Sequence, residues 1–315
     1  MKRKEVGITI GRCAQLATLL EVSAYPKPGN IHRLHDFPTT RYEHFLAGSV
    51  ALSPALNSLA EKGYDVKKGS KKWQNIGLGK GILLAVEDSL RWQRGGNVNL
   101  GIVLLFAPIS AAAGYTLKNG STDVTELRKK IIDVTQCTTS GDSVAVYRAI
   151  QKTMTERVLG HVDELDVNDK SSIYQIKVEG LSLIKIFQSC AERDSICREW
   201  ISGFEVTFTK GYPYLAQSIQ NKDPNTAVVD TFLYLLSEEP DSLISRKRGH
   251  EAALYVSKKA RKILTEGGFE SKKGRELSEE LDRELQIAGG ALNPGTTADI
   301  TAASIFILLL TGWRP

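Results

Sequence analysis

The segment that decides the fold spans residues 7–24 and reads GITIGRCAQLATLLEVSA. Its apolar residues Ile10, Cys13, Ala17 and Leu20 recur at spacings of three and four, which predicts an amphipathic helix. Pro26 ends this helix, because proline lacks the N–H that a helix interior needs. The same spacing recurs along most of the chain, at residues 41–63, 78–96, 99–117, 123–136, 141–158, 172–202, 211–220, 225–238, 249–266, 275–288 and 297–312.

Strand signals are weak by comparison. Only FEVTFT at residues 204–209 alternates apolar and polar residues, which predicts a short strand or an extended turn there. No series of strands alternates with the helices, so a doubly wound sheet is excluded. No repeat and no shift in composition marks a boundary. The sequence therefore predicts one all-α globular domain over residues 1–315, with about ten to thirteen helices.

Composition excludes several classes of protein. The chain has 315 residues, is 42% hydrophobic and 24% charged, and carries a net charge of +5, so it can bury a sizeable core. It has no arginine-rich tail and no zinc-finger spacing, which argues against nucleic-acid binding. Its apolar runs at residues 95–117 and 300–312 are too short for membrane spans, and its start lacks a signal sequence. We expect a cytoplasmic protein.

The four cysteines are Cys13, Cys137, Cys190 and Cys197. No two of them have the CxxC spacing of metal or redox motifs. Cys190 and Cys197 are seven residues apart, about two turns of a predicted helix. We expect small buried residues with reduced thiols, as is usual in the cytoplasm.

Four polar segments share one layout, in which an irregular stretch leads into an apolar helix. They read KPGNIHRLHDF at 27–37, GGNVNLG at 95–101, PDSLISRKRGHEAA at 240–253 and NPGTTADITAAS at 293–304. Helix N-termini expose unpaired N–H groups, so such segments suit phosphate or carboxylate groups. Taken singly, each also has a plainer interpretation: Asp299 could cap a helix with Thr296, and Arg246 to Arg248 or His32, His35 and His44 could be surface residues.

Five motifs stand in order between residues 19 and 310. They are PKPGNIHR at 26–33, Asn97 and Asn99 before Gly101, GYP at 211–213, Asp241 followed by Ser245, Arg246 and Gly249, and PGTTADI at 294–300. In this order they resemble the motifs of the triphosphoribosyl-dephospho-CoA synthase family, which prepares the prosthetic group of citrate lyase and malonate decarboxylase. The resemblance implies a single domain of that kind over residues 1–315, with polar loops that converge on a nucleotide site.

The sequence departs from the bacterial pattern in four places. The acidic residues that precede the GYP element are not matched in register, although Glu205 lies close. A Gly-Ala-His-x-Asp-Met segment is replaced by a stretch in which His35 and Asp36 stand nearest. An Asp-Thr-Asn element reads Asp241-Ser242-Leu243, and a His-Lys pair reads Asn99-Leu100. The chain is therefore most similar to a divergent, archaeal-like branch.

The resemblance implies a transferase that moves the 5-triphosphoribosyl group of ATP to the 2′-hydroxyl of 3′-dephospho-CoA and releases adenine. It implies ATP and that acceptor as partners and Mg²⁺ with the ATP. It leaves a homodimer open and assigns no metal ligand. The implied catalytic residues are Asp241 and Asp299, with Asp36 or His35 third. The implied nucleotide- and phosphate-binding residues are Lys27, Gly29, Asn30, Arg33, Asn97, Asn99, Arg246, Lys247, Gly295 and Thr296.

Three alternatives stay open at this point. The same fold and nucleotide chemistry could serve a different acceptor. An ATP-dependent phosphotransferase or hydrolase would release phosphate instead of adenine, although the chain has no Walker A motif. A helical module that binds without catalysis is the third.

Overall fold

The fold is built from α-helices throughout the part of the chain that the structure, a computed structural model, describes: residues 1–154 and 165–315. The first half contains α1 (Arg3–Ser23), α2 (Tyr42–Ala51), α3 (Ser53–Lys67), η1 (Trp73–Asn75), α4 (Leu78–Trp92), α5 (Leu100–Thr116), α6 (Val124–Gln136) and α7 (Ser140–Thr153). The second half contains α9 (Lys170–Val178), α10 (Leu183–Cys190), α11 (Ser195–Ser202), η2 (Thr207–Gly211), α12 (Tyr212–Ser218), α13 (Pro224–Glu238), α14 (Ser242–Arg248), α15 (His250–Thr265), α16 (Lys272–Gln286) and α17 (Gly295–Leu310). The all-α prediction is confirmed.

The helices are more numerous than the ten to thirteen that the sequence predicts. The main reason is the range 172–202, which was expected to be one helix and forms parts of α9, α10 and α11. Gly180 adopts a positive φ of 64° after α9, and Asp194 caps a fresh helix start at α11. A helix cannot continue through either residue in that role.

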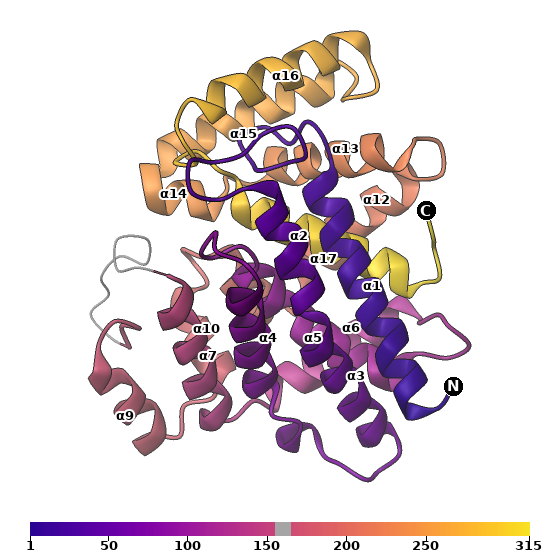
Figure 1. The fold of residues 1–315 in the computed structure, drawn as a ribbon, viewed down its shortest axis with the longest axis vertical. Helices are drawn as coiled ribbons and strands as arrows, with labels where there is room; N and C mark the ends of the chain where they lie inside the picture. The colour runs from indigo at the N-terminus through magenta and orange to yellow at the C-terminus, as the bar shows by residue number, and fades with distance from the viewer. Residues whose placement is uncertain (155–164) are drawn as a thin grey trace.

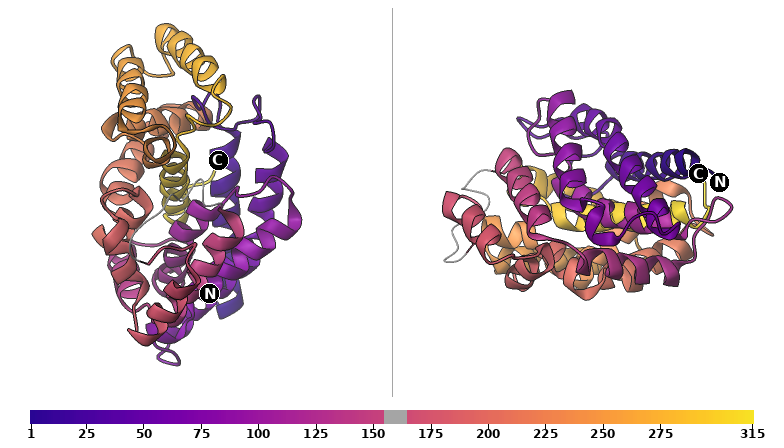
Figure 2. Two further views of the ribbon diagram at one scale, coloured as in Figure 1. Left: turned by 90° about the vertical axis from the view of Figure 1, so that its left-hand side faces the viewer. Right: turned by 90° about the horizontal axis from the view of Figure 1, so that it is seen from below.

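The core is centred on α5 and α17, which are apolar on nearly every side. Both helices bury most of their residues, and the rings of Phe106 and Phe306 lie 4.6 Å apart between them. Seen from below, α17 lies between the N-terminal helices and the later ones (Figure 2). No helix in the described ranges is long and apolar enough to cross a membrane. The two apolar runs are therefore core helices, as predicted.

The strand or extended turn predicted at residues 204–209 is wrong. Residues 205–209 are helical and run into the π-helical turn η2, whereas Phe204 forms the bend before them with a φ of 59°. The buried carboxylate of Glu199 accepts hydrogen bonds from the N–H groups of Val206 and Thr207, at 2.8 and 2.9 Å. These bonds satisfy the first donors of the new helical turn, so the residues do not need a neighbouring strand.

The polar stretch after α1 crosses one end of the molecule and packs against later helices (Figure 1). Asp282 in α16 accepts hydrogen bonds from the Gly29 N–H and from His32 Nε2, both at 3.0 Å. Asn225 at the start of α13 pairs with the backbone of Tyr25 through both amide atoms. Contacts with distant helices thus fix this irregular segment.

Candidate active site

A cavity of about 290 Å³ opens between helices that are far apart in the sequence. Its walls come from the ends of α5, α14 and α17 and from α7, α10 and α11. Four predicted site residues line it: Asn97, Arg246, Thr296 and Asp299. Three of the four polar segments therefore meet at one cavity.

Asp299 lies in the first turns of α17 and faces the start of α5. Its carboxylate occupies the space that a side chain on Gly101 would need: a β-carbon there would come within 1.9 Å of Asp299 Oδ2. Gly101 thus permits the close approach of the two helices at the cavity wall. The capping role that the local sequence suggests for Asp299 is not seen, because Pro294 precedes α17 and no side chain caps its first turn.

The pKa of Asp299 is raised well above its ordinary value. Loss of contact with water is the largest cause, followed by the charges of Glu21, Asp241 and Asp194, while Lys27 acts in the opposite direction. A carboxyl group of this kind holds its proton at higher pH than usual. Such a group suits general acid–base catalysis near neutral pH.

Asp241 is also buried, but its oxygens are engaged in hydrogen bonds. One oxygen accepts from the N–H groups of Leu243 and Ile244 at the start of α14, at 2.9 and 3.0 Å. The other accepts from the N–H and the hydroxyl of Thr297, each at 2.8 Å. Asp241 therefore joins α14 to α17 beside Asp299.

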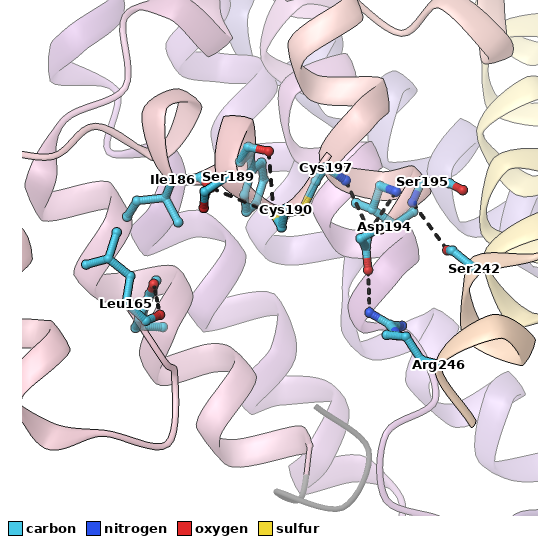
Figure 3. The surroundings of a disulfide bond; sticks show 12 residues. Leu165, Ile186, Ser189, Cys190, Asp194, Ser195, Cys197, Ser242 and Arg246 are labelled. Atoms are coloured by element: carbon cyan, nitrogen blue, oxygen red, sulfur yellow. Dashed lines mark hydrogen bonds and ion pairs between the residues drawn. A yellow bond between two sulfur atoms is a disulfide. The ribbon is translucent and has the colours of Figure 1, made fainter. Parts of the chain in front are cut away.

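Arg246 forms an ion pair with Asp194, a residue that the sequence analysis missed. The other oxygen of Asp194 caps α11, with the N–H groups of Ile196 and Cys197 at 2.8 and 3.1 Å. Figure 3 shows Asp194 between α11 and Arg246 at the cavity wall. Asp194 was missed because residues 172–202 were expected to form one continuous helix. An N-cap residue is expected only where a helix begins.

Cys190 and Cys197 form a disulfide in the cavity wall, so the prediction of reduced thiols is wrong for this pair. On one straight helix, residues seven apart would lie about 10 Å from each other. Instead α10 ends at Cys190 and a new helix begins at Ser195, which leaves the two Cα atoms 6.0 Å apart. This separation suits a disulfide. Cys13 and Cys137 are free thiols, as expected.

Lys27 is buried and does not line the cavity. Its side chain is fully buried and forms an ion pair with Glu21 of α1, which is 2% exposed. Lys27 and Asp299 influence each other's pKa through their charges. Glu21 escaped the sequence analysis because a glutamate on an amphipathic helix is usually a surface residue.

The remaining residues of the opening segment have structural contacts outside the cavity wall. Arg33 is exposed and contacts Asn225, His35 pairs through its backbone with His32, and Asp36 accepts a hydrogen bond from the Tyr42 N–H at 2.7 Å. Gly29 adopts a positive φ of 76°, and the Asn30 carbonyl accepts from Gln286 at 2.8 Å. The structure does not bring these five predicted residues to the cavity.

Four further predicted residues lie at the edges of the site. Asn97 caps the Leu100 N–H at 3.1 Å. Asn99 is buried against Gly48, and neither of its amide atoms has a hydrogen-bond partner among the described residues. Lys247 donates to the Gly290 carbonyl at 3.1 Å, and Gly295 packs against Leu243. Of these, only Asn97 lines the cavity.

A family model described as CitG, ATP:dephospho-CoA triphosphoribosyl transferase, matches residues 8–315. A 2-(5''-triphosphoribosyl)-3'-dephosphocoenzyme-A synthase from Escherichia fergusonii is 26% identical over 302 residues, which cover 95% of this chain and 89% of that relative. A probable synthase of the same name from Salmonella typhimurium is 32% identical over 107 residues, and the match spans only 35% of its length and 34% of this chain.

A solved structure shows the same similarity in three dimensions. The crystal structure of a proposed triphosphoribosyl-dephospho-CoA synthase from Archaeoglobus fulgidus superimposes with a TM-score of 0.66 at 27% identity. The match covers 87% of this chain and 100% of that one. Sequence and fold thus agree with the resemblance that the five motifs indicate.

Proposed function

Because the chain belongs to the CitG family of ATP:dephospho-CoA triphosphoribosyl transferases, we propose that it transfers the 5-triphosphoribosyl group of ATP to the 2′-hydroxyl of 3′-dephospho-CoA. In this reaction the hydroxyl oxygen attacks C1′ of the ATP ribose, the bond from C1′ to adenine breaks, and the triphosphate stays on the sugar. The observation that carries the proposal is the placement of Asp299, a carboxyl with a raised pKa, in a cavity wall with Arg246, Thr296 and Asn97.

Asp299 is the group best suited to move the proton. Adenine leaves as a neutral molecule only if a ring nitrogen gains a proton, and the attacking hydroxyl must lose one. A protonated Asp299 would donate to the departing adenine. The carboxylate left behind would stabilise the positive charge that develops on the sugar and then accept the hydroxyl proton, which restores the starting state.

The other cavity residues would position the substrates. Arg246 presents a planar guanidinium suited to phosphate oxygens. At the start of α17, the N–H groups of Gly295 and Thr297 bond to Asn293 and Asp241. Thr296, which lines the cavity between them, would therefore be the residue of this turn that contacts a phosphate oxygen. Asp241 would act through α17, because its four hydrogen bonds hold the turn that carries Asp299.

Mg²⁺ would enter this site with ATP. The described residues contain no group of three or more His, Cys, Asp or Glu side chains that could hold a metal by themselves. The phosphates of ATP and water would therefore supply most of the ligands, as is common for this ion. Mg²⁺ would neutralise part of the negative charge of the triphosphate. Residues of the chain would carry out the proton transfers.

The direct test is incubation of the purified protein with ATP, Mg²⁺ and 3′-dephospho-CoA, followed by chromatography for adenine and mass spectrometry for the product. We expect one adenine for each acceptor molecule enlarged by a triphosphoribosyl unit. Reactions that lack the acceptor or Mg²⁺ are the controls. Release of ADP or phosphate in place of adenine would contradict the proposal and indicate a phosphotransferase or hydrolase. Adenine release with another acceptor only would retain the chemistry and change the substrate.

A further inference from the structure

The cavity has two unlike ends. Around Asp299, Arg246 and Thr296 it is polar, whereas the wall formed by α7, α10 and the segment before α9 is mostly apolar, with Asp166 and Ser189 as its polar members. Its apolar residues include Tyr147, Ile150, Met154, Leu165, Ile186 and Phe187, and Leu104 of α5 adjoins them. Figure 3 shows Leu165 and Ile186 on one side of the disulfide and Asp194 with Arg246 on the other. A ligand that fills the whole cavity would need a charged end and an apolar end.

The two aromatic residues at the apolar end already have partners. The Tyr147 hydroxyl donates to the Leu165 carbonyl at 2.7 Å. The Phe187 ring stands edge-on to Trp200, with centroids 5.0 Å apart and planes at 88°. The remaining surface is mainly aliphatic. It suits a flexible aliphatic chain better than a purine ring, which needs a flat face to stack on and partners for its ring nitrogens.

We propose that the apolar end of the cavity binds the pantetheine arm of the acceptor. This inference rests on the proposed function and assigns a subsite within it. The acceptor carries adenosine and a diphosphate at one end and, at the other, an arm of methylene, methyl and amide groups that ends in a thiol. With its 2′-hydroxyl at Asp299 and its diphosphate near Arg193, the arm extends between α7 and α10.

This subsite gives the enzyme a means of choosing its acceptor. ATP also carries a 2′-hydroxyl, so a second ATP could be modified in place of the CoA precursor. Only the CoA precursor has an arm that removes apolar surface at Ile150 and Ile186 from water. The apolar end therefore acts on acceptor binding and not on the binding of ATP as donor.

The test compares ligands with and without the arm. ADP has the adenosine and diphosphate of 3′-dephospho-CoA and lacks pantetheine. Calorimetry would measure the Kd of 3′-dephospho-CoA, ADP and ATP for the wild type, Ile150→Gln and a second cavity variant, Met154→Gln. Both side chains are half-buried in the cavity wall, so the proteins should still fold. Ile184→Gln is the matched control, because Ile184 lies on α10 with similar exposure and outside the cavity wall.

We expect Ile150→Gln and Met154→Gln to weaken 3′-dephospho-CoA binding about tenfold or more, since each places a polar group against the arm. The Kd values of ADP and ATP should change less than twofold. The control Ile184→Gln should leave the Kd values of all three ligands unchanged. Equal losses for 3′-dephospho-CoA and ADP, or no loss for either, would overturn the assignment. A selective loss for ATP would place the donor adenine there and also overturn it. The proposed function fails separately, through absence of adenine release in the wild type.

Discussion

The Asp299 carboxylate lies directly against the Cα atom of Gly101, so that a β-carbon on Gly101 would meet Asp299 Oδ2 at 1.9 Å. Two motifs almost 200 positions apart thereby build one wall of the cavity. Glycine is required at residue 101 by this contact and not by a turn, because Gly101 is in the first turn of α5. The position of the proposed proton donor depends on the absence of a side chain opposite it.

Substitution Gly101→Ala should therefore reduce kcat by about 100-fold, the effect expected when a catalytic group moves by about an ångström. Helix formation should survive, since alanine is the better helix former. The control is Gly141→Ala in the first turn of α7, where the added carbon meets only Thr139 Oγ1, at 3.5 Å. Steady-state kinetics with circular dichroism would check both variants. Unchanged kcat in Gly101→Ala would remove Asp299 from the mechanism.

Substitution Asp299→Asn should reduce activity strongly and stabilise the fold. The folded-state pKa of Asp299 is raised, mainly by burial, so the folded protein binds this proton more tightly than the unfolded chain does. Stability is then lost as pH rises from the unfolded value, about 3.9, through the raised value. Asparagine removes that loss, while kcat should fall by about 10² to 10⁴.

Thermal unfolding between pH 4 and pH 8 would measure this effect. The difference in Tm between Asp299→Asn and the wild type should grow with pH, by about 2 °C for each kcal/mol in a chain of this size. Asp88→Asn, in an exposed ion pair with Arg91, is the matched control. If the difference shrinks as pH rises, the raised pKa of Asp299 is contradicted.

Substitution Lys27→Met should destabilise the protein by about 3 to 5 kcal/mol, because it leaves Glu21 without its partner inside the protein. Neither side chain is more than 3% exposed. The double variant Glu21→Leu with Lys27→Met should recover most of the loss, since no unpaired charge remains. Urea unfolding would measure the free energy of unfolding of the wild type and of both variants. A loss of ATP affinity at wild-type stability would instead mean that Lys27 binds phosphate directly.

The helical part of the fold could be predicted because its signal is local. Spacings such as Ile10, Cys13 and Ala17 appear within single helices, and the all-α class follows from their recurrence. The errors occur where a contact between residues outside the predicted segment determines its secondary structure. Residues 204–209 alternate as a strand would, but Glu199 supplies hydrogen bonds that start a helix there. The break before Asp194 was missed, and the disulfide depends on that break.

Cavity residues could be predicted where the helix that carries the side chain is itself part of the sequence motif. Asn97 and Asp299 line the cavity because they stand at the starts of the apolar core helices α5 and α17, and Arg246 reaches it from the short helix α14. The opening segment differs, since its placement depends on contacts such as Gly29 with Asp282, which are 253 residues apart. Sequence spacing holds no information about such pairs.

Substitution Arg246→Ala should weaken ATP binding by about 10- to 100-fold, the loss expected for hydrogen bonds to a charged group. The fold should remain, because Asp194 keeps its hydrogen bonds to the start of α11. Arg248→Ala is the matched control, since Arg248 is an exposed arginine on the same helix and does not line the cavity. Calorimetric titration with ATP would compare them. Equal losses in both variants would point to a general effect of charge.

The Cys190–Cys197 disulfide should link stability to ATP binding. It joins two cysteines with a sequence separation of 7, and the loop between them contains Asp194, the partner of Arg246. The double variant Cys190→Ser with Cys197→Ser should lose about 2 to 3 kcal/mol of unfolding free energy by the chain-entropy estimate. Its Kd for ATP should also rise, because the free loop holds Asp194 and Arg246 less firmly. Reduction of the wild type with dithiothreitol should reproduce both effects and leave the double variant unchanged. A reduced wild type with the stability and ATP affinity of the oxidised protein would show that the disulfide supports neither.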